Sequence, residues 1–360
     1  MKDAPDKSFA NIRLRKPRIT AYASCLHSSW DRSKKMMAIG RLCVAAALLC
    51  SVSTHVLAVE GSSTAGPIGG TDMRSAMLPG PGIYGGAVLF HAEANRFFDG
   101  SGRAIPALDA LNLFRERVGG FLLYVPETQV LGGSLGFLGV LSSGQECGRL
   151  FQSTPKRCIN GGGDPYVEFD WSRYFGTVRP SQYPGAFPIP EGLTIQLGFG
   201  AVVPIGKYDA MTAAQQGLVI GNNIWDLSPI AAFTYITRPI IAEGTEISAK
   251  SYWNNYLRNP DTLYSTGSLL NLDFAVTERI GRLQIGVAGF YATQVDDDKL
   301  LGTRIPPDGR RATVLDLGGV VAYDMPEYAT SLKLKALTTV VTDNTVKSYG
   351  VSLALVKKLW

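Results

Sequence analysis

The sequence has few charges, few histidines and no long apolar segment. Only 18% of its 360 residues are charged while 46% are apolar, which excludes an intrinsically disordered chain and argues against a nucleic-acid-binding protein. The longest apolar run, at 42–50, has about half of the roughly 20 residues that a membrane-spanning helix needs. A composition rich in Gly, Tyr, Leu and Val with balanced hydropathy instead favours alternating β-strands.

Residues 1–58 have the pattern of an N-terminal extension followed by a signal peptide. Basic residues precede the apolar run, and the small residues of a signal-peptidase site follow it at 56–58, which is the order found in secretory signal peptides. We expect cleavage after Ala58. The stretch before the apolar run is longer than a leader requires, so Met36 or Met37 is an alternative start. A membrane anchor is the other interpretation, which the short run disfavours.

Removal of this leader reverses the sign of the net charge. The leader holds 10 of the 35 Lys and Arg residues and 3 of the 30 Asp and Glu residues, which leaves 25 basic and 27 acidic residues and a net charge of −2. No basic surface for nucleic acid remains, so we predict no nucleic-acid partner.

Two cysteines, Cys147 and Cys158, remain after the leader is removed. They flank a polar stretch, and in an oxidising compartment such a pair predicts one loop disulfide. Metal binding is the alternative, but His91 is the only remaining histidine that could complete a site. We therefore predict no metal site and no cofactor.

From residue 81 onwards, apolar and polar residues alternate in repeated segments. Within 193–201 every odd position is apolar and every even position is Thr, Gln or Gly, and this period of two puts successive side chains on opposite faces of a sheet. The pattern predicts an all-β fold: a transmembrane antiparallel up-and-down β-barrel of about twelve strands over 81–360, preceded by a periplasmic N-terminal tail at 59–80. The predicted strands are approximately 81–97, 115–126, 129–141, 164–175, 191–204, 222–237, 243–257, 266–279, 281–295, 311–325, 328–341 and 346–360.

The connections between these segments alternate in length, as expected for an outer-membrane barrel with short periplasmic turns and long outer loops. The short set contains 127–128, 238–242, 280 and 326–327, and the long set contains 98–114, 142–163, 205–221, 258–265 and 296–310. Two connections break the rule, because 176–190 is long on the short side and 342–345 is short on the long side. A soluble β-sandwich has no reason to sort its loops in this way.

The polar parity of the strands predicts the residues that line the barrel interior. His91 is placed inward because it lies opposite in parity to Tyr84, Val88 and Phe90. The predicted pore-lining residues are His91, Gln196, Asp226, Glu246, Lys250, Asp273, Gln284, Asp316, Lys333 and Lys335. Tyr and Trp residues cluster near the strand ends, as in interfacial aromatic girdles.

The sequence after residue 58 offers little for catalysis. It contains no C-x-x-C or phosphate loop, and its G-x-S-x-G match at 132–136 would have only His91 as the base of a triad. We therefore predict no catalytic residues. An outer-membrane hydrolase is the less favoured alternative, and a structural or adhesive barrel that acts through its loops is another. The acidic run 296–298 could bind calcium, but a solvated loop is the favoured interpretation.

From residue 161 to the end, a series of short motifs resembles, in order and spacing, the outer-membrane family named for a meta-pathway of phenol degradation. This family is also described as SphA-like transporters. The run 161–165 and the segment 204–209 open the series, and 331–335 closes it. The residues that carry the resemblance are Gly163, Asp164, Pro204, Gly206, Tyr208, Asp209, Asn223, Trp225, Asn259, Tyr264, Gly267, Gly289, Tyr291, Gln294 and Asp297. The Cys147–Cys158 insertion and the 176–190 link depart from the family pattern.

The resemblance implies a monomeric twelve-stranded channel in the outer membrane of a Gram-negative bacterium. Its implied function is passive uptake of small hydrophobic or aromatic molecules. Its implied partners are such a solute and the surrounding lipid and lipopolysaccharide.

Overall fold

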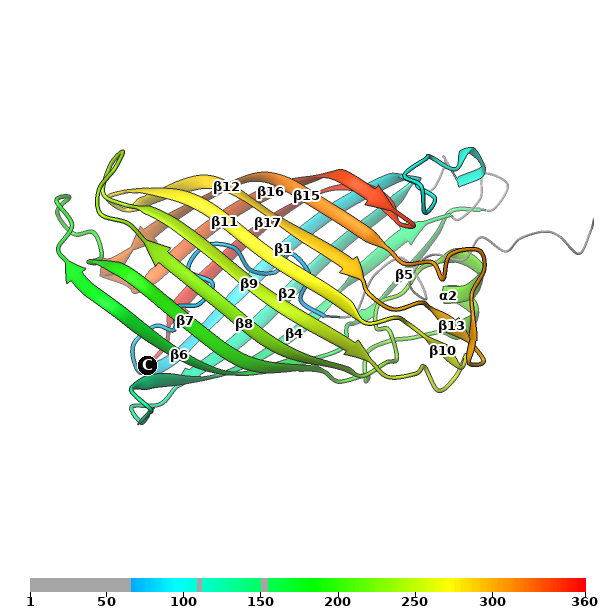
Figure 1. Ribbon diagram of the computed structural model, residues 1–360, viewed down its shortest axis with the longest axis horizontal. Helices are drawn as coiled ribbons and strands as arrows, with labels where there is room; N and C mark the ends of the chain where they lie inside the picture. The colour runs from blue at the N-terminus through cyan, green and yellow to red at the C-terminus, as the bar shows by residue number, and fades with distance from the viewer. Residues whose placement is uncertain (1–65, 109–111, 150–154) are drawn as a thin grey trace, which may run out of the picture. The chain divides into compact units, whose positions relative to one another are not determined.

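The computed structural model describes residues 66–108, 112–149 and 155–360, and β-strands dominate them (Figure 1). The predicted leader, its cleavage site and the alternative starts lie outside the described residues. The long strands are β1 (Gly82–Phe97), β2 (Leu113–Val125), β4 (Gly133–Gly148), β6 (Tyr166–Arg179), β7 (Ile189–Val202), β8 (Asp226–Ile236), β9 (Thr245–Tyr256), β11 (Leu269–Ile280), β12 (Leu283–Gln294), β15 (Thr313–Met325), β16 (Thr330–Asp343) and β17 (Val346–Lys358). The short elements are β3 (Gln129–Val130), β5 (Arg157–Gly162), β10 (Tyr264–Ser265), β13 (Lys299–Leu300), β14 (Thr303–Arg304), helix α2 (Ala210–Gln216) and the 3₁₀ turns η1 (Pro106–Leu108) and η2 (Pro326–Tyr328).

The long strands form one closed antiparallel barrel, which confirms the predicted fold and the number of twelve strands. Each long strand pairs with the next one along the chain, and β1 pairs with β17 to close the ring from Tyr84↔Lys358 to Phe97↔Val346. Two strands, β5 and β6, share the position next to β4 in the wall. β4 pairs with β6 over 134–140 and with β5 over 143–148. Closure gives each of the twelve long strands a backbone partner on both sides, as a lipid environment requires.

The outer face of the barrel carries the exposed apolar side chains. Leu89 and Val118 face each other across β1 and β2 and are 55% and 50% exposed, whereas a soluble protein would bury such a pair. The opposite parity points inward, and on β8, β9 and β11 it is almost wholly buried. The exposed apolar belt is the surface that a bilayer would cover.

The two ends of the barrel differ in their connections. The short-turn end carries 126–132, 180–188, 237–244, 281–282 and 326–329, and the long-loop end carries 98–112, 149–156, 203–225, 257–268, 295–312 and 344–345. In the two-residue turn 281–282, Gly281 has a φ of 62°, a conformation that glycine adopts without strain. The two predicted exceptions to the length rule are present. By the rule for outer-membrane barrels, the long-loop end is the one expected to face outward.

None of the helices in the described part of the chain is long and apolar enough to cross a membrane.

Candidate functional site: the barrel interior

Residues 66–78, here called the plug, run along the inside of the barrel and are seen as the blue segment between the strands (Figure 1). The plug begins at the long-loop end, where Gly66 lies against Asp226, the first residue of β8. A Cβ added to Gly66 would be only 2.6 Å from the Asp226 carboxylate. The plug ends near the short-turn end, where Leu78 lies against Gly136 of β4. A Cβ added to Gly136 would be only 2.8 Å from the Leu78 side chain. The prediction of a periplasmic tail at 59–80 is therefore wrong for this part of the tail. Its partners are strand residues far away in sequence, which local composition cannot reveal.

The first half of the plug is held by charges on β11 and β16. Asp72, whose side chain is wholly buried, accepts from Lys333 Nζ at 2.8 Å and pairs with Lys335 Nζ at 3.0 Å. Asp273 accepts from the backbone N–H groups of Gly69 and Thr71, each at 2.9 Å. Buried charges are stable only when they are paired and hydrogen-bonded in this way.

Arg74 is the main contact of the second half of the plug. Its guanidinium donates to both oxygens of Asp324, at 2.7 and 3.2 Å, and to Gln284 Oε1 at 2.7 and 3.0 Å. Its backbone N–H donates to Glu246. Planar bidentate pairing of this kind fixes position as well as charge. Arg74 therefore fastens the plug to β9, β12 and β15.

Apolar packing completes the contact between plug and wall. Met73 is buried against Ala275, Ala288, Val320 and Ala322, whose small side chains leave space for it. A flexible Met side chain suits such an irregular gap.

The structure places every predicted pore-lining residue except His91 on the inner face, and five of them contact the plug: Glu246, Asp273, Gln284, Lys333 and Lys335. Lys250 Nζ binds Glu168 Oε1 at 2.5 Å, and Gln284 Nε2 donates to Glu246 at 2.7 Å. Gln196, Asp226 and Asp316 are also buried. This half of the interior, from β6 to β16, is occupied by the plug and by buried polar side chains, and oxygens of Gln196, Asp226 and Asp316 have no hydrogen-bond partner among the described residues.

His91 lies on the outer face, so the inward prediction is wrong. It shares the parity of the exposed Leu89 on β1, and its partner on β2 is Glu116. Its ring nitrogens lie 3.3 Å from Glu93 and 3.7 Å from Glu116. In β1 both the odd-numbered and the even-numbered positions carry apolar residues. The sequence pattern assigned the even-numbered positions to the lipid-facing side, whereas the structure places the odd-numbered ones there.

The remaining inner surface is apolar and partly open. Here β1, β2 and β4 turn apolar residues inward, and each of these side chains is only partly buried, so accessible space adjoins it. Inward-facing glycines on neighbouring strands show that the aromatic rings point into the barrel. The Phe121 ring lies over Gly86 and the Phe90 ring lies over Gly350, where an added Cβ would contact each ring. This apolar wall consists of Val88, Phe90, Phe121, Leu123, Leu138 and Val140. The strand periodicity did not predict these residues, although the continuous apolar run of β1 was a usable signal.

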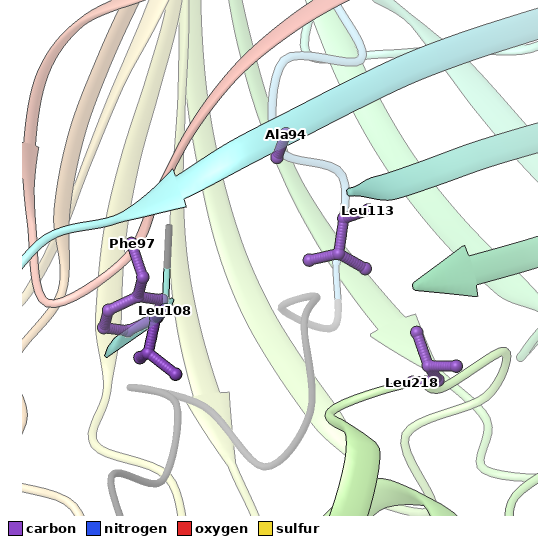
Figure 2. Packing of buried hydrophobic residues seen from close by; sticks show 5 residues of the cluster. All are labelled: Ala94, Phe97, Leu108, Leu113 and Leu218. Atoms are coloured by element: carbon purple, nitrogen blue, oxygen red, sulfur yellow. The ribbon is translucent and has the colours of Figure 1, made fainter. Parts of the chain in front are cut away.

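Two loops meet at the long-loop end and form an apolar cluster (Figure 2). Leu218, which follows α2, is 1% exposed and belongs to this mouth cluster together with residues of β1, η1 and β2. The mouth cluster consists of Ala94, Phe97, Leu108, Leu113 and Leu218. In the loop that carries η1, Asp99 accepts from the side chain and backbone of Ser101 and from the backbone of Arg103, which lowers the pKa of its carboxyl to about 2.

An arginine from the wall fixes the segment after α2. Arg117 on β2 donates to the carbonyl oxygens of Val219 and Ile220, at 3.1 and 3.2 Å. Residues 218–220, the lid segment, therefore reach an inward side chain of the wall. Arg117 is in turn 3.6 Å from the buried Glu146 of β4.

The predicted disulfide between Cys147 and Cys158 is present, and it joins directly opposed residues of β4 and β5. Among the described residues, no cluster of His, Cys, Asp and Glu could hold a metal ion.

Residues of the predicted family motifs organise the loops at the same end. Asp164 accepts from the backbone N–H groups of Gly206 and Asn222, at 2.7 and 2.6 Å. Asn223 and Asn259 are joined by a side-chain hydrogen bond of 3.2 Å. These motif residues thus belong to a framework of loops at the long-loop end, whereas Gly289, Tyr291 and Gln294 lie in β12.

The comparisons with known proteins agree with this architecture. The family described as "Putative MetA-pathway of phenol degradation" matches residues 94–355. The chain belongs to this family. No curated protein sequence matches it.

Among solved structures, the COG4313 outer membrane channel from Pseudomonas putida F1 is similar to it with a TM-score of 0.64 at 13% identity, covering 79% of this chain and 98% of the channel. The Pseudomonas putida toluene transporter TodX has a TM-score of 0.38 at 9% identity, covering 85% and 97%. The family member described here is an outer-membrane β-barrel of a Gram-negative bacterium, because closed barrels with an apolar outer belt belong to that membrane.

Proposed function

We propose that this barrel is a passive channel through which small apolar molecules, including aromatic ones, cross the outer membrane. The observation that carries the proposal is the division of the interior. The polar half is closed by the plug, while the apolar wall on β1, β2 and β4 keeps accessible space beside it. Passage then follows the apolar wall, with no cofactor, energy source or catalytic step.

The free energy of binding to the apolar wall is in the range that suits transport. A one-ring solute that buries about 100 Å² of apolar surface on the wall gains about 2.5 kcal/mol. That gain draws the solute from water, yet it is small enough for rapid release. Selectivity comes from lining groups and width. The family name and the toluene transporter TodX are consistent with solutes of this class. We also propose that the barrel acts as a monomer in contact with lipid and lipopolysaccharide.

A paired substitution in the apolar wall tests the proposal. Thr has nearly the shape of Val, so Val88→Thr with Val140→Thr keeps the width and removes apolar contact. In cells with intact lipopolysaccharide, uptake of a hydrophobic naphthylamine dye should fall about tenfold. Ion conductance of the purified protein in planar bilayers should stay the same.

Val314→Thr is the matched control, because Val314 points inward on β15, opposite Ala292 and away from the apolar wall. It should leave dye uptake unchanged. Equal dye uptake by the paired variant and the wild type would refute transport along the apolar wall. Uptake that does not depend on the protein at all would favour a structural barrel.

A further inference from the structure

We propose that the Cys147–Cys158 disulfide positions the lid segment, and that the bond thereby keeps the long-loop mouth of the channel narrow. The inference rests on the proposed function only in taking the barrel as a conduit. The covalent bond that controls the width of the mouth lies outside the barrel interior.

The lid segment occupies the mouth as a packed element. Leu218, Val219 and Ile220 are 1%, 2% and 5% exposed, although they belong to a connection between strands. Such burial within a connection requires partners on both sides. Arg117 supplies the partner from the wall, and the mouth cluster supplies the apolar contacts (Figure 2).

The third support of the lid segment is β5. Lys207 donates from its backbone N–H to the Gly162 carbonyl and from its ammonium group to the Asn160 carbonyl, each at 2.8 Å. The Lys207 carbonyl accepts from the N–H of Gly221, the residue that directly follows the lid segment. Ile159 of β5 also packs against the mouth cluster that contains Leu218.

The strand β5 is itself weakly held without the disulfide. It has six residues, and β4 is its only partner among the described strands, over Ser143↔Gly162 to Gly148↔Arg157. Isolated strand pairs of this size have marginal stability. The disulfide closes the far end of this pair at Cys147↔Cys158, directly beside Ile159. Loss of the bond therefore loosens β5, and through Lys207 and Ile159 it frees the lid segment.

The experiment compares the oxidised wild type, the wild type treated with reductant on the long-loop side, and the Cys147→Ser/Cys158→Ser variant. Single-channel conductance should rise about twofold in the last two, because the lid segment no longer narrows the mouth. Reductant should have no further effect on the serine variant. Arg117→Met, which removes the wall contact of the lid segment, should raise conductance by a similar factor. Arg103→Ala, an exposed arginine on a neighbouring loop, should not.

Limited trypsin digestion gives a second measurement that does not require conductance. Cleavage after Lys207 should be slow in the oxidised protein and several times faster in the reduced protein and in the serine variant. Cleavage after Arg258, in the loop between β9 and β11, should stay constant. Equal conductance and equal cleavage after Lys207 in all forms would overturn the proposal. Dye uptake decides separately whether the channel carries apolar solutes.

Discussion

Substitution of Arg74 is the most direct test of the plug. The Arg74→Ala variant loses the bidentate pair with Asp324 and the bonds to Gln284. Removal of one partner from a buried pair costs about 3–5 kcal/mol. Asp324 keeps Arg279 at 3.5 Å and the Ser331 hydroxyl at 2.5 Å, so the lower figure applies. We expect the plug to be destabilised by about 3 kcal/mol, which shifts the ratio of released to docked plug about 150-fold.

Planar-bilayer recording measures this ratio, because a released plug leaves a wider path. The variant should spend far more time at high conductance than the wild type. Deletion of residues 66–78 sets the conductance of the fully open barrel. Arg103→Ala is the matched control, since Arg103 is 81% exposed and pairs only with Asp99 among the described residues. A high-conductance fraction in Arg74→Ala within about twofold of the wild type would contradict the reasoning, given the about 150-fold expectation. So would a deletion variant with wild-type conductance.

Two further predictions follow from the interior and from the wall. Lys333→Glu places a carboxylate against the buried Asp72, so plug release and a shift of ion selectivity toward cations should appear together in bilayer recordings; unchanged reversal potentials would contradict this. The closed hydrogen-bonded ring should keep the unheated protein folded in dodecyl sulfate, so it should migrate faster in gels before boiling than after it; recovery in the soluble periplasmic fraction would refute membrane placement.

Strand periodicity predicted the barrel because the membrane enforces a period of two on every wall strand. The alternation in 193–201 falls within β7, Ile189–Val202, and the sorting of loop lengths identified the two ends. Tight turns and closure then follow from local chemistry and from the need to pair every backbone group. The disulfide was also predictable, because removal of the predicted leader would leave only two cysteines.

The plug could not be predicted from these patterns. Gly69 and Asp273 are 204 residues apart in sequence, and a segment without regular secondary structure has no period. His91 shows a different limit. Residues 83–90 of β1 are apolar on both parities, so a rule that sends apolar residues to lipid has no basis for choosing between them. The ambiguity itself marks a wall strand with lipid on one side and an apolar interior on the other.

The division of the interior changes the meaning of the charged residues that parity identifies. Lys333, Lys335 and Asp273 point inward, as expected of a water-filled pore, yet their partners are Asp72 and the plug backbone. A strong field from these groups is cancelled by pairing within a few ångströms. They therefore act on permeation through the position of the plug. In the proposed channel, the side chains that meet a moving solute are Val88, Phe90 and their apolar neighbours. Charge substitutions should thus change how often the channel opens and which ions pass once the plug is released, while isosteric changes in the apolar wall should change which apolar solutes pass.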